Sequence, residues 1–233
     1  MEKLVVSICW YAVFVFSVTV HEAAHAWAAL RGGDPTAYRG GQVSLDPRPH
    51  IRRSPFGMVI LPILSLAYTG WPFGFASAPY DPAWARRYPR RSAAMALVGP
   101  LANLLLLLAA GVAVRVGVGA GWLAAPDQVR YTQMTVGASA GASAGAAALL
   151  VSMLLSLNLI LFILNLLPLP PLDGWGALPL LLSRAQAQRL QAVQRHPAVG
   201  WLGILVAWQF FPHLLRPAMS LVLQLLYPGV QYG

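Results

Sequence analysis

The chain has 233 residues, of which 58% are hydrophobic and only 10% are charged. Because soluble domains carry about 25% charged residues, this composition excludes an ordinary soluble protein and predicts one that crosses the membrane several times. A net charge of +9 would also suit a nucleic-acid-binding protein, but the arginines lie in loops between apolar runs, which is the pattern of membrane topology. The single cysteine, Cys9, excludes an internal disulfide and a zinc site built from cysteines.

The first apolar segment extends from about residue 4 to residue 30 and is long enough to span the bilayer with some tilt. We interpret it as a retained transmembrane helix, since it is too long for the apolar core of a signal peptide. After it, residues 42–45 predict a short strand and residues 46–49 predict turns. The apolar run 55–68 is short and contains Pro62, which favours a re-entrant segment over a full span. Residues 70–80 alternate aromatic and small side chains, as a strand or an extended loop would.

The remaining apolar segments are longer. Residues 92–114 predict a clear spanning helix and residues 147–167 another, and a shorter apolar piece follows at 175–182. The last segment, about 199–227, contains two prolines and predicts either one span or two pieces. Together these segments predict an all-α polytopic membrane protein with about five to six membrane helices and a short re-entrant or β-like segment after the first helix. We expect residues 1–233 to form a single membrane-embedded domain.

Arginines are concentrated in three stretches, 31–53, 86–91 and 184–195. If the run 55–68 is re-entrant, all three stretches lie on the same side of the membrane. Since loops rich in lysine and arginine face the cytoplasm, the pattern predicts cytoplasmic arginine-rich loops and an N-terminus on the outside.

The first apolar segment contains the sequence His21-Glu22-Ala23-Ala24-His25. On a helix, histidines four residues apart share one face and can bind one zinc ion, and the glutamate between them is placed to act as a general base. Charged groups inside a membrane are costly and by default mark a functional site. The motif therefore predicts a hydrolytic zinc site, with one ion per chain, inside a membrane helix.

A catalytic zinc takes three protein ligands and leaves one position for water. Asp173 is the best candidate for the third ligand, because it follows a helix that runs in the same direction as the first and therefore ends at a similar depth. The alternative for Asp173 is an ordinary Asp-Gly turn after a proline run. Asn165 could donate a hydrogen bond to the oxyanion that forms during peptide hydrolysis, or could bond to nearby backbone. His50 is expected to be a loop residue, and Asn103 a buried hydrogen-bonding residue near the site.

Three motifs together resemble the site-2 protease family of zinc intramembrane metalloproteases. They are the motif at 21–25, the stretch Gly99-Pro100-Leu101-Ala102-Asn103, and residues 165–174, which resemble Asn-x-x-Pro-x-x-x-x-Asp-Gly. The resemblance implies zinc bound by His21, His25 and Asp173, a catalytic Glu22, and Asn165 near the scissile carbonyl.

The same resemblance implies regulated intramembrane proteolysis, in which the substrate is the transmembrane segment of another protein in the inner membrane of a bacterium. It suggests the compact bacterial branch of the family, which carries no PDZ domain or nucleotide-sensing module. The bilayer and that substrate are the expected partners, and no nucleic acid is expected.

Two other functions compete with this one. A membrane zinc protease of a different type would take a later glutamate as its third ligand, and no glutamate follows Glu22. A non-proteolytic membrane zinc-binding protein or carrier is the second alternative, and it would need polar residues along more than one helix, of which this chain has few.

Overall fold

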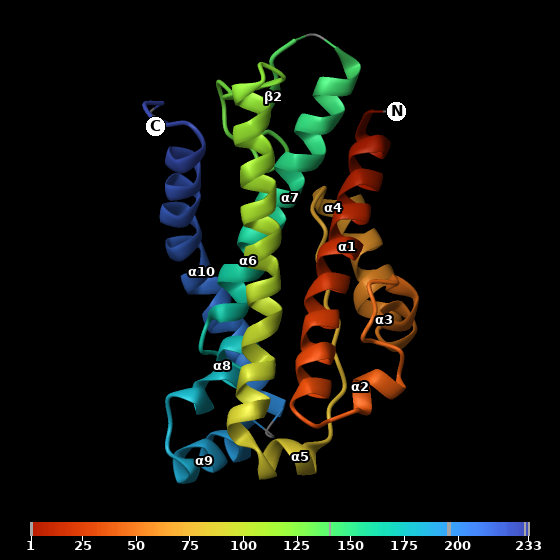
Figure 1. Cartoon of the computed structure of the whole chain (residues 1–233), viewed down its shortest axis with the longest axis vertical. Helices are drawn as coiled ribbons and strands as arrows, with labels where there is room; N and C mark the ends of the chain where they lie inside the picture. The colour runs from red at the N-terminus through yellow and green to blue at the C-terminus, as the bar shows by residue number, and fades with distance from the viewer. Residues whose placement is uncertain (1, 140, 195–196, 231, 233) are drawn as a thin grey trace.

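The computed structural model describes residues 2–139, 141–194, 197–230 and 232, and four long helices make up most of it (Figure 1). Each of the four is long and apolar enough to cross a membrane, judged by length and composition. The four helices are α1 (Glu2–Arg31), α6 (Pro89–Gly119), α7 (Ala142–Leu166) and α10 (Pro197–Leu226). The N-terminal end of α1 and the C-terminal end of α10 lie at the same end of the bundle (Figure 1).

The all-α polytopic fold is confirmed, but the described residues contain four such helices rather than five to six. The run expected to be re-entrant is short, as predicted, and forms a π-helical turn followed by a nine-residue helix. The apolar piece at 175–182 is also too short to span. The last segment is one continuous helix in spite of its two internal prolines. The short elements are η1 (Phe56–Ile60), α4 (Leu61–Thr69), α8 (Asp173–Ala177) and the 3₁₀ turn η2 (Leu178–Leu180).

In the described part of the chain, the arginine-rich stretches contain four further short helices, α2 (Thr36–Arg39), α3 (Pro47–Arg53), α5 (Pro82–Arg87) and α9 (Arg184–Gln194). Of these, α2, α5 and α9 lie toward the end of the bundle opposite both termini, and α3 lies beside α1 further from that end (Figure 1). The prediction of a strand at 42–45 is wrong, because residue 42 has no regular secondary structure and residues 43–45 form bends. Asp46 accepts a hydrogen bond from the backbone N–H of Arg48 at 2.9 Å and so begins a helix rather than a run of turns. Arg195 lies outside the described residues.

An extended segment, residues 72–81, runs from α4 to α5 beside α1 (Figure 1). It forms no regular strand, and the backbone N–H of Phe75 donates to the carbonyl of Gly57 at 3.0 Å. A Cβ atom at Gly57 would collide with the Phe75 carbonyl, so glycine is needed for this close approach. The β-like part of the prediction therefore corresponds to an extended chain. The two strands of the structure, β1 (Leu123–Ala124) and β2 (Val136–Gly137), pair antiparallel after α6.

Helix α6 packs against both α1 and α7 and so forms the centre of the bundle. Where α1 meets α6, small residues such as Ala26, Ala29 and Ala93 are fully buried and let the two helices approach closely. This close packing brings the side chains of the α1 motif against the backbone of α6.

Candidate metal centre

The three residues predicted to bind zinc lie together. His21 and His25 project from α1, and Asp173 is the first residue of α8. The two histidine Nε2 atoms are 3.0 Å apart, and Asp173 Oδ2 lies 3.0 Å from His21 Nε2 and 3.3 Å from His25 Nε2. Both histidines are buried, with 6% and 5% of their surface exposed. Residues distant in the sequence thus offer three donor atoms to one point.

These distances can be compared with those that zinc requires. Zinc–nitrogen and zinc–oxygen bonds of about 2.0–2.2 Å in a tetrahedron place neighbouring ligand atoms roughly 3.3 Å apart. The three donor atoms are 3.0–3.3 Å apart. Two imidazoles and one carboxylate are a ligand set that zinc accepts in catalytic sites. The residues present therefore fit a zinc ion.

Each histidine must present an unprotonated Nε2 to a metal, so the hydrogen bond of its other nitrogen matters. His25 Nδ1 lies 2.8 Å from the backbone carbonyl oxygen of Met95 in α6. A carbonyl can only accept, so Nδ1 carries the proton and donates it. The lone pair of His25 is therefore on Nε2, the nitrogen that faces Asp173.

His21 is oriented by a chain of buried side chains. Asn158 Nδ2 donates to the carbonyl of Leu154 at 2.9 Å and to Ser17 Oγ at 3.0 Å, which fixes the orientation of its amide. Asn158 Oδ1 then accepts from Asn103 Nδ2 at 2.8 Å, and Asn103 Oδ1 faces His21 Nδ1 at 2.6 Å. Both asparagines are fully buried. Since the facing oxygen can only accept, His21 must also carry its proton on Nδ1 and its lone pair on Nε2.

Gly99 in α6 provides the space in which the imidazoles sit. A Cβ atom at this position would stand 2.7 Å from His21 Nε2 and closer still to His25 Nε2. Only glycine allows the helix backbone to approach the histidines this closely. The Gly-Pro pair singled out in the sequence therefore lies at the metal centre itself.

Glu22 is also buried, with 5% of its surface exposed, and lines a cleft of about 650 Å³ together with His25 and Asp173. The extended segment lines this cleft at Ala76 to Ala78, and Trp175 of α8 lines it as well. The cleft thus brings together the Glu22 carboxylate, two of the three donor residues (His25 and Asp173) and an extended stretch of backbone.

The other residues from the sequence analysis lie outside this group of donors. Asn165 is in the last turn of α7 and is partly buried; in the described part of the chain its side chain makes no hydrogen bond, and it does not line the cleft. His50 is buried, and its Nε2 lies 3.0 Å from the carbonyl oxygen of Ser44, so it ties α3 to the preceding loop.

The roles of Ser17 and Asn158 were missed. A polar side chain inside an apolar helix was the signal that could have identified them.

The loop that follows α1 is attached to the extended segment through Asp34. Its carboxylate accepts from the backbone N–H and hydroxyl of Thr36, at 2.9 and 2.5 Å, and from the backbone N–H of Asp81 at 2.7 Å. Burial alone would raise the pKa of the Asp34 carboxyl, but these hydrogen bonds outweigh it and hold the pKa below its ordinary value of 3.8. Asp34 thus joins the end of the motif helix to the segment that forms the cleft wall.

Known proteins resemble this chain over most of its length. The model of Peptidase family M50 matches residues 10–206. YwhC of Bacillus subtilis, whose name assigns it provisionally to the zinc metalloproteases, is 28% identical over 162 residues, which are 69% of this chain and 63% of that protein. Rip2 of Mycobacterium tuberculosis, named in the same way, is 31% identical over 198 residues, which are 83% of this chain and 64% of that protein.

The chain thus spans a little less than two thirds of the length of these two relatives. No solved structure matches it. The family match covers α1 from residue 10 onward, the whole of α6, Asp173 and part of α10. The chain therefore belongs to peptidase family M50, the site-2 protease family.

Proposed function

We propose that this protein is a zinc metalloendopeptidase that hydrolyses a peptide bond in or near a transmembrane segment of another membrane protein, in regulated intramembrane proteolysis. One observation carries the proposal. Three donor atoms that fit one zinc ion lie 3.0–3.3 Å apart between apolar helices, and the buried carboxyl group of Glu22 lines the same cleft. Membership of a peptidase family supports it.

In this proposal His21, His25 and Asp173 hold the zinc, one ion per chain. When bound, zinc supplies a Lewis acid that polarises the scissile carbonyl and makes water acidic enough to lose a proton near neutral pH. Glu22 accepts that proton and later delivers it to the leaving amine nitrogen. Asn103 and Met95 keep the protons of the two histidines on Nδ1, so that both Nε2 atoms remain free.

Asn165 retains its proposed role as a donor to the oxyanion. Donors of this kind typically contribute roughly 3 kcal/mol to catalysis. Its position in the last turn of α7, one short loop before Asp173, is compatible with this role if a bound substrate completes the site. A kinetic comparison of Asn165→Ala with wild type tests this assignment.

A transmembrane substrate must be locally unwound before it can be cut, because a helix hides its carbonyls in hydrogen bonds. The extended segment at 76–80 lines the cleft and forms no strand pairing of its own. We propose that it pairs with the unwound stretch of substrate in the manner of an added β-strand. This would hold the scissile bond beside Glu22 and the three ligands.

For the location, we propose the inner membrane of a bacterium, with the arginine-rich end of the bundle in the cytoplasm and the N-terminus outside. The arginine-rich helices α5 and α9 lie at the end opposite both termini (Figure 1), which supports this orientation under the positive-inside rule. The metal centre then lies in the cytoplasmic half of the bundle, because His21 is past the middle of α1.

The test compares wild type with Glu22→Gln, Asp173→Ala and, as a matched control, Asp127→Asn in the loop beyond α6. Zinc per purified chain and the membrane-protein fragments produced in cells are both measured. We expect Glu22→Gln to keep its zinc and lose the fragments, Asp173→Ala to lose both, and the control to lose neither.

Three results would contradict parts of the proposal. Unchanged fragments with Glu22→Gln would remove the catalytic assignment. Undiminished zinc with Asp173→Ala would remove that ligand. Zinc bound to the wild-type protein, together with the same fragments in wild type, Glu22→Gln and Asp173→Ala, would favour the alternative of a non-proteolytic zinc-binding protein or carrier.

A further inference from the structure

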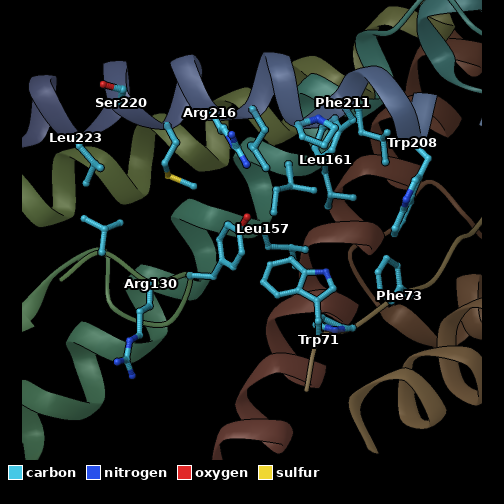
Figure 2. A pocket seen from close by; sticks show the side chains of 18 of the residues that line it. Trp71, Phe73, Arg130, Leu157, Leu161, Trp208, Phe211, Arg216, Ser220 and Leu223 are labelled. Atoms are coloured by element: carbon cyan, nitrogen blue, oxygen red, sulfur yellow. The ribbon is translucent and has the colours of Figure 1, made fainter. Parts of the chain in front are cut away.

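A second cavity, of about 1840 Å³, lies between α10, α7 and the start of the extended segment (Figure 2). Its walls are mostly apolar and aromatic, including Trp71, Trp208 and Phe211. Leu172, the neighbour of Asp173, lines both this cavity and the cleft at the metal centre. The cavity therefore extends to the residue next to the third metal ligand.

One charged side chain points into this apolar space. Arg216 of α10 extends from its helix into the cavity (Figure 2). Among the described residues it has no ion-pair or hydrogen-bond partner, and the residues that line the cavity include no Asp or Glu. An arginine inside a membrane helix is costly and usually marks a binding function. A negatively charged group in the cavity would offset that cost.

Helix α10 is also the least enclosed of the four long helices. In its most apolar stretch 17% of the residues are buried, against 33–44% in the other three. At one side of the cavity Phe73 of the extended segment meets Trp208 of α10, with ring centroids 6.2 Å apart (Figure 2). The cavity is therefore bounded on one side by the long helix that the rest of the protein encloses least.

We propose that this cavity binds the transmembrane segment of the substrate and that Arg216 selects segments that carry an acidic side chain. The inference rests on the proposed function and adds the class of substrate to it. Two observations favour a peptide over an anionic lipid. The cavity leads to Leu172 beside the metal centre, and Arg216 lies ten residues, or about 15 Å, before the end of α10 at Leu226. A lipid headgroup would have to leave the membrane surface to reach it.

The position of the acidic residue follows from the geometry of α10. A Cβ atom at Gly203 would collide with the carbonyl of Pro170, so this point of α10 is level with the loop that leads to Asp173. Arg216 is thirteen residues further along the helix, which is about 20 Å. The acidic side chain should therefore lie roughly thirteen helical residues from the cleaved bond, on the side of the chain termini.

The test is a binding measurement that does not depend on cleavage. The full-length Glu22→Gln protein is placed in phosphatidylcholine vesicles with a fluorescent single-span peptide of leucine and alanine that carries one Asp, Asn or Lys at the level of Arg216. We expect the Asp peptide to bind about tenfold more tightly than the Asn peptide. Arg216→Met should bring this ratio close to one, and Arg216→Lys should preserve it. Arg216→Glu should favour the Lys peptide.

Arg130→Met serves as the matched control, because Arg130 lies beside the same cavity but points away from it (Figure 2). The proposal would be overturned if the Glu22→Gln protein with Arg216 intact bound the Asp and Asn peptides equally. It would also be overturned if Arg130→Met lowered the Asp-to-Asn affinity ratio as much as Arg216→Met does. If phosphatidylglycerol in the vesicles abolishes the ratio, the cavity binds an anionic lipid and the proposal is wrong. The cleavage comparison of wild type with Glu22→Gln tests the catalytic function separately, so the two failures are distinguishable.

Discussion

Replacing Asn103 by leucine tests how the bundle prepares His21 to bind zinc. The substitution preserves the approximate size of the side chain but removes the oxygen that faces His21 Nδ1 at 2.6 Å. The imidazole can then carry its proton on either nitrogen, and a proton on Nε2 prevents metal binding. Zinc affinity should fall while the helices remain packed.

The size of the effect follows from how many buried groups lose their partners. Loss of a residue that orients a metal ligand typically weakens metal binding 10- to 100-fold, which is about 1.4–2.8 kcal/mol. Asn103→Leu leaves both His21 Nδ1 and Asn158 Oδ1 without partners in a fully buried place, so we expect a loss of about 100-fold. Asn158→Leu leaves the direct bond to His21 in place but frees the Asn103 amide to rotate, so we expect about 10-fold.

The assay is a competition titration of the metal-free, full-length protein against a chelator of known zinc affinity. Ser156→Ala is the matched control, because Ser156 is also fully buried in α7 and bonds only to backbone carbonyls, those of Tyr131, Ser152 and Met153. It should affect stability but not zinc affinity. Wild-type affinity in Asn103→Leu, or an equal loss in Ser156→Ala, would refute the reasoning.

Three further predictions concern other parts of the site. Gly99→Ala should abolish stoichiometric zinc binding, measured as zinc per purified chain, because the added methyl group occupies the space of the two imidazoles; normal zinc content would contradict the close approach. Asn165→Ala should lower kcat about 100-fold with little change in KM if the side chain donates to the oxyanion, whereas an unchanged kcat would leave Asn165 with backbone contacts only. Asp34→Ala should destabilise the protein by roughly 2 kcal/mol at pH 7, measured as thermal unfolding in detergent. Because the folded-state pKa of Asp34 lies below 3.8, its contribution is complete above that pH and is lost as the pH falls through the lower folded value. A difference between variant and wild type that does not shrink below pH 3.8 would argue against this ionisation.

The convergence of His21, His25 and Asp173 could be predicted because each step rests on a simple regularity. Helical spacing places the two histidines on one face, and two helices that run in the same direction end at a similar depth. The structure brings all three donor atoms within 4.8 Å of one another. The scarcity of acidic residues in the chain made Asp173 the best candidate for the third ligand.

The parts of the fold that were predicted incorrectly depend on tertiary contacts. The strand expected at 42–45 has no partner strand, and strands are stabilised mainly by such partners; Gln42 instead donates weakly to the carbonyl of Ser77 in the extended segment. The expected number of membrane helices was too high: the sequence leaves open whether the segment 199–227 is one span or two pieces, and it forms one continuous helix, while the apolar piece at 175–182 is too short to span. A short apolar run can be stabilised by packing inside the protein or at its edge, so its apolar composition alone does not show that it spans the bilayer.

The treatment of charged residues explains what sequence reasoning missed. The rule that a charge inside a membrane segment marks function was applied to Glu22 and to Asp173, and it identified the metal centre. Arg216 meets the same condition, but the two prolines in its segment left open whether that segment is one span or two pieces. Once α10 is seen to be continuous from Pro197 to Leu226, Arg216 lies well inside a span and beside a cavity without acidic residues. The same argument that predicted a catalytic role for Glu22 therefore supports the binding role proposed for this arginine, and the carboxylate that it lacks should come from the substrate.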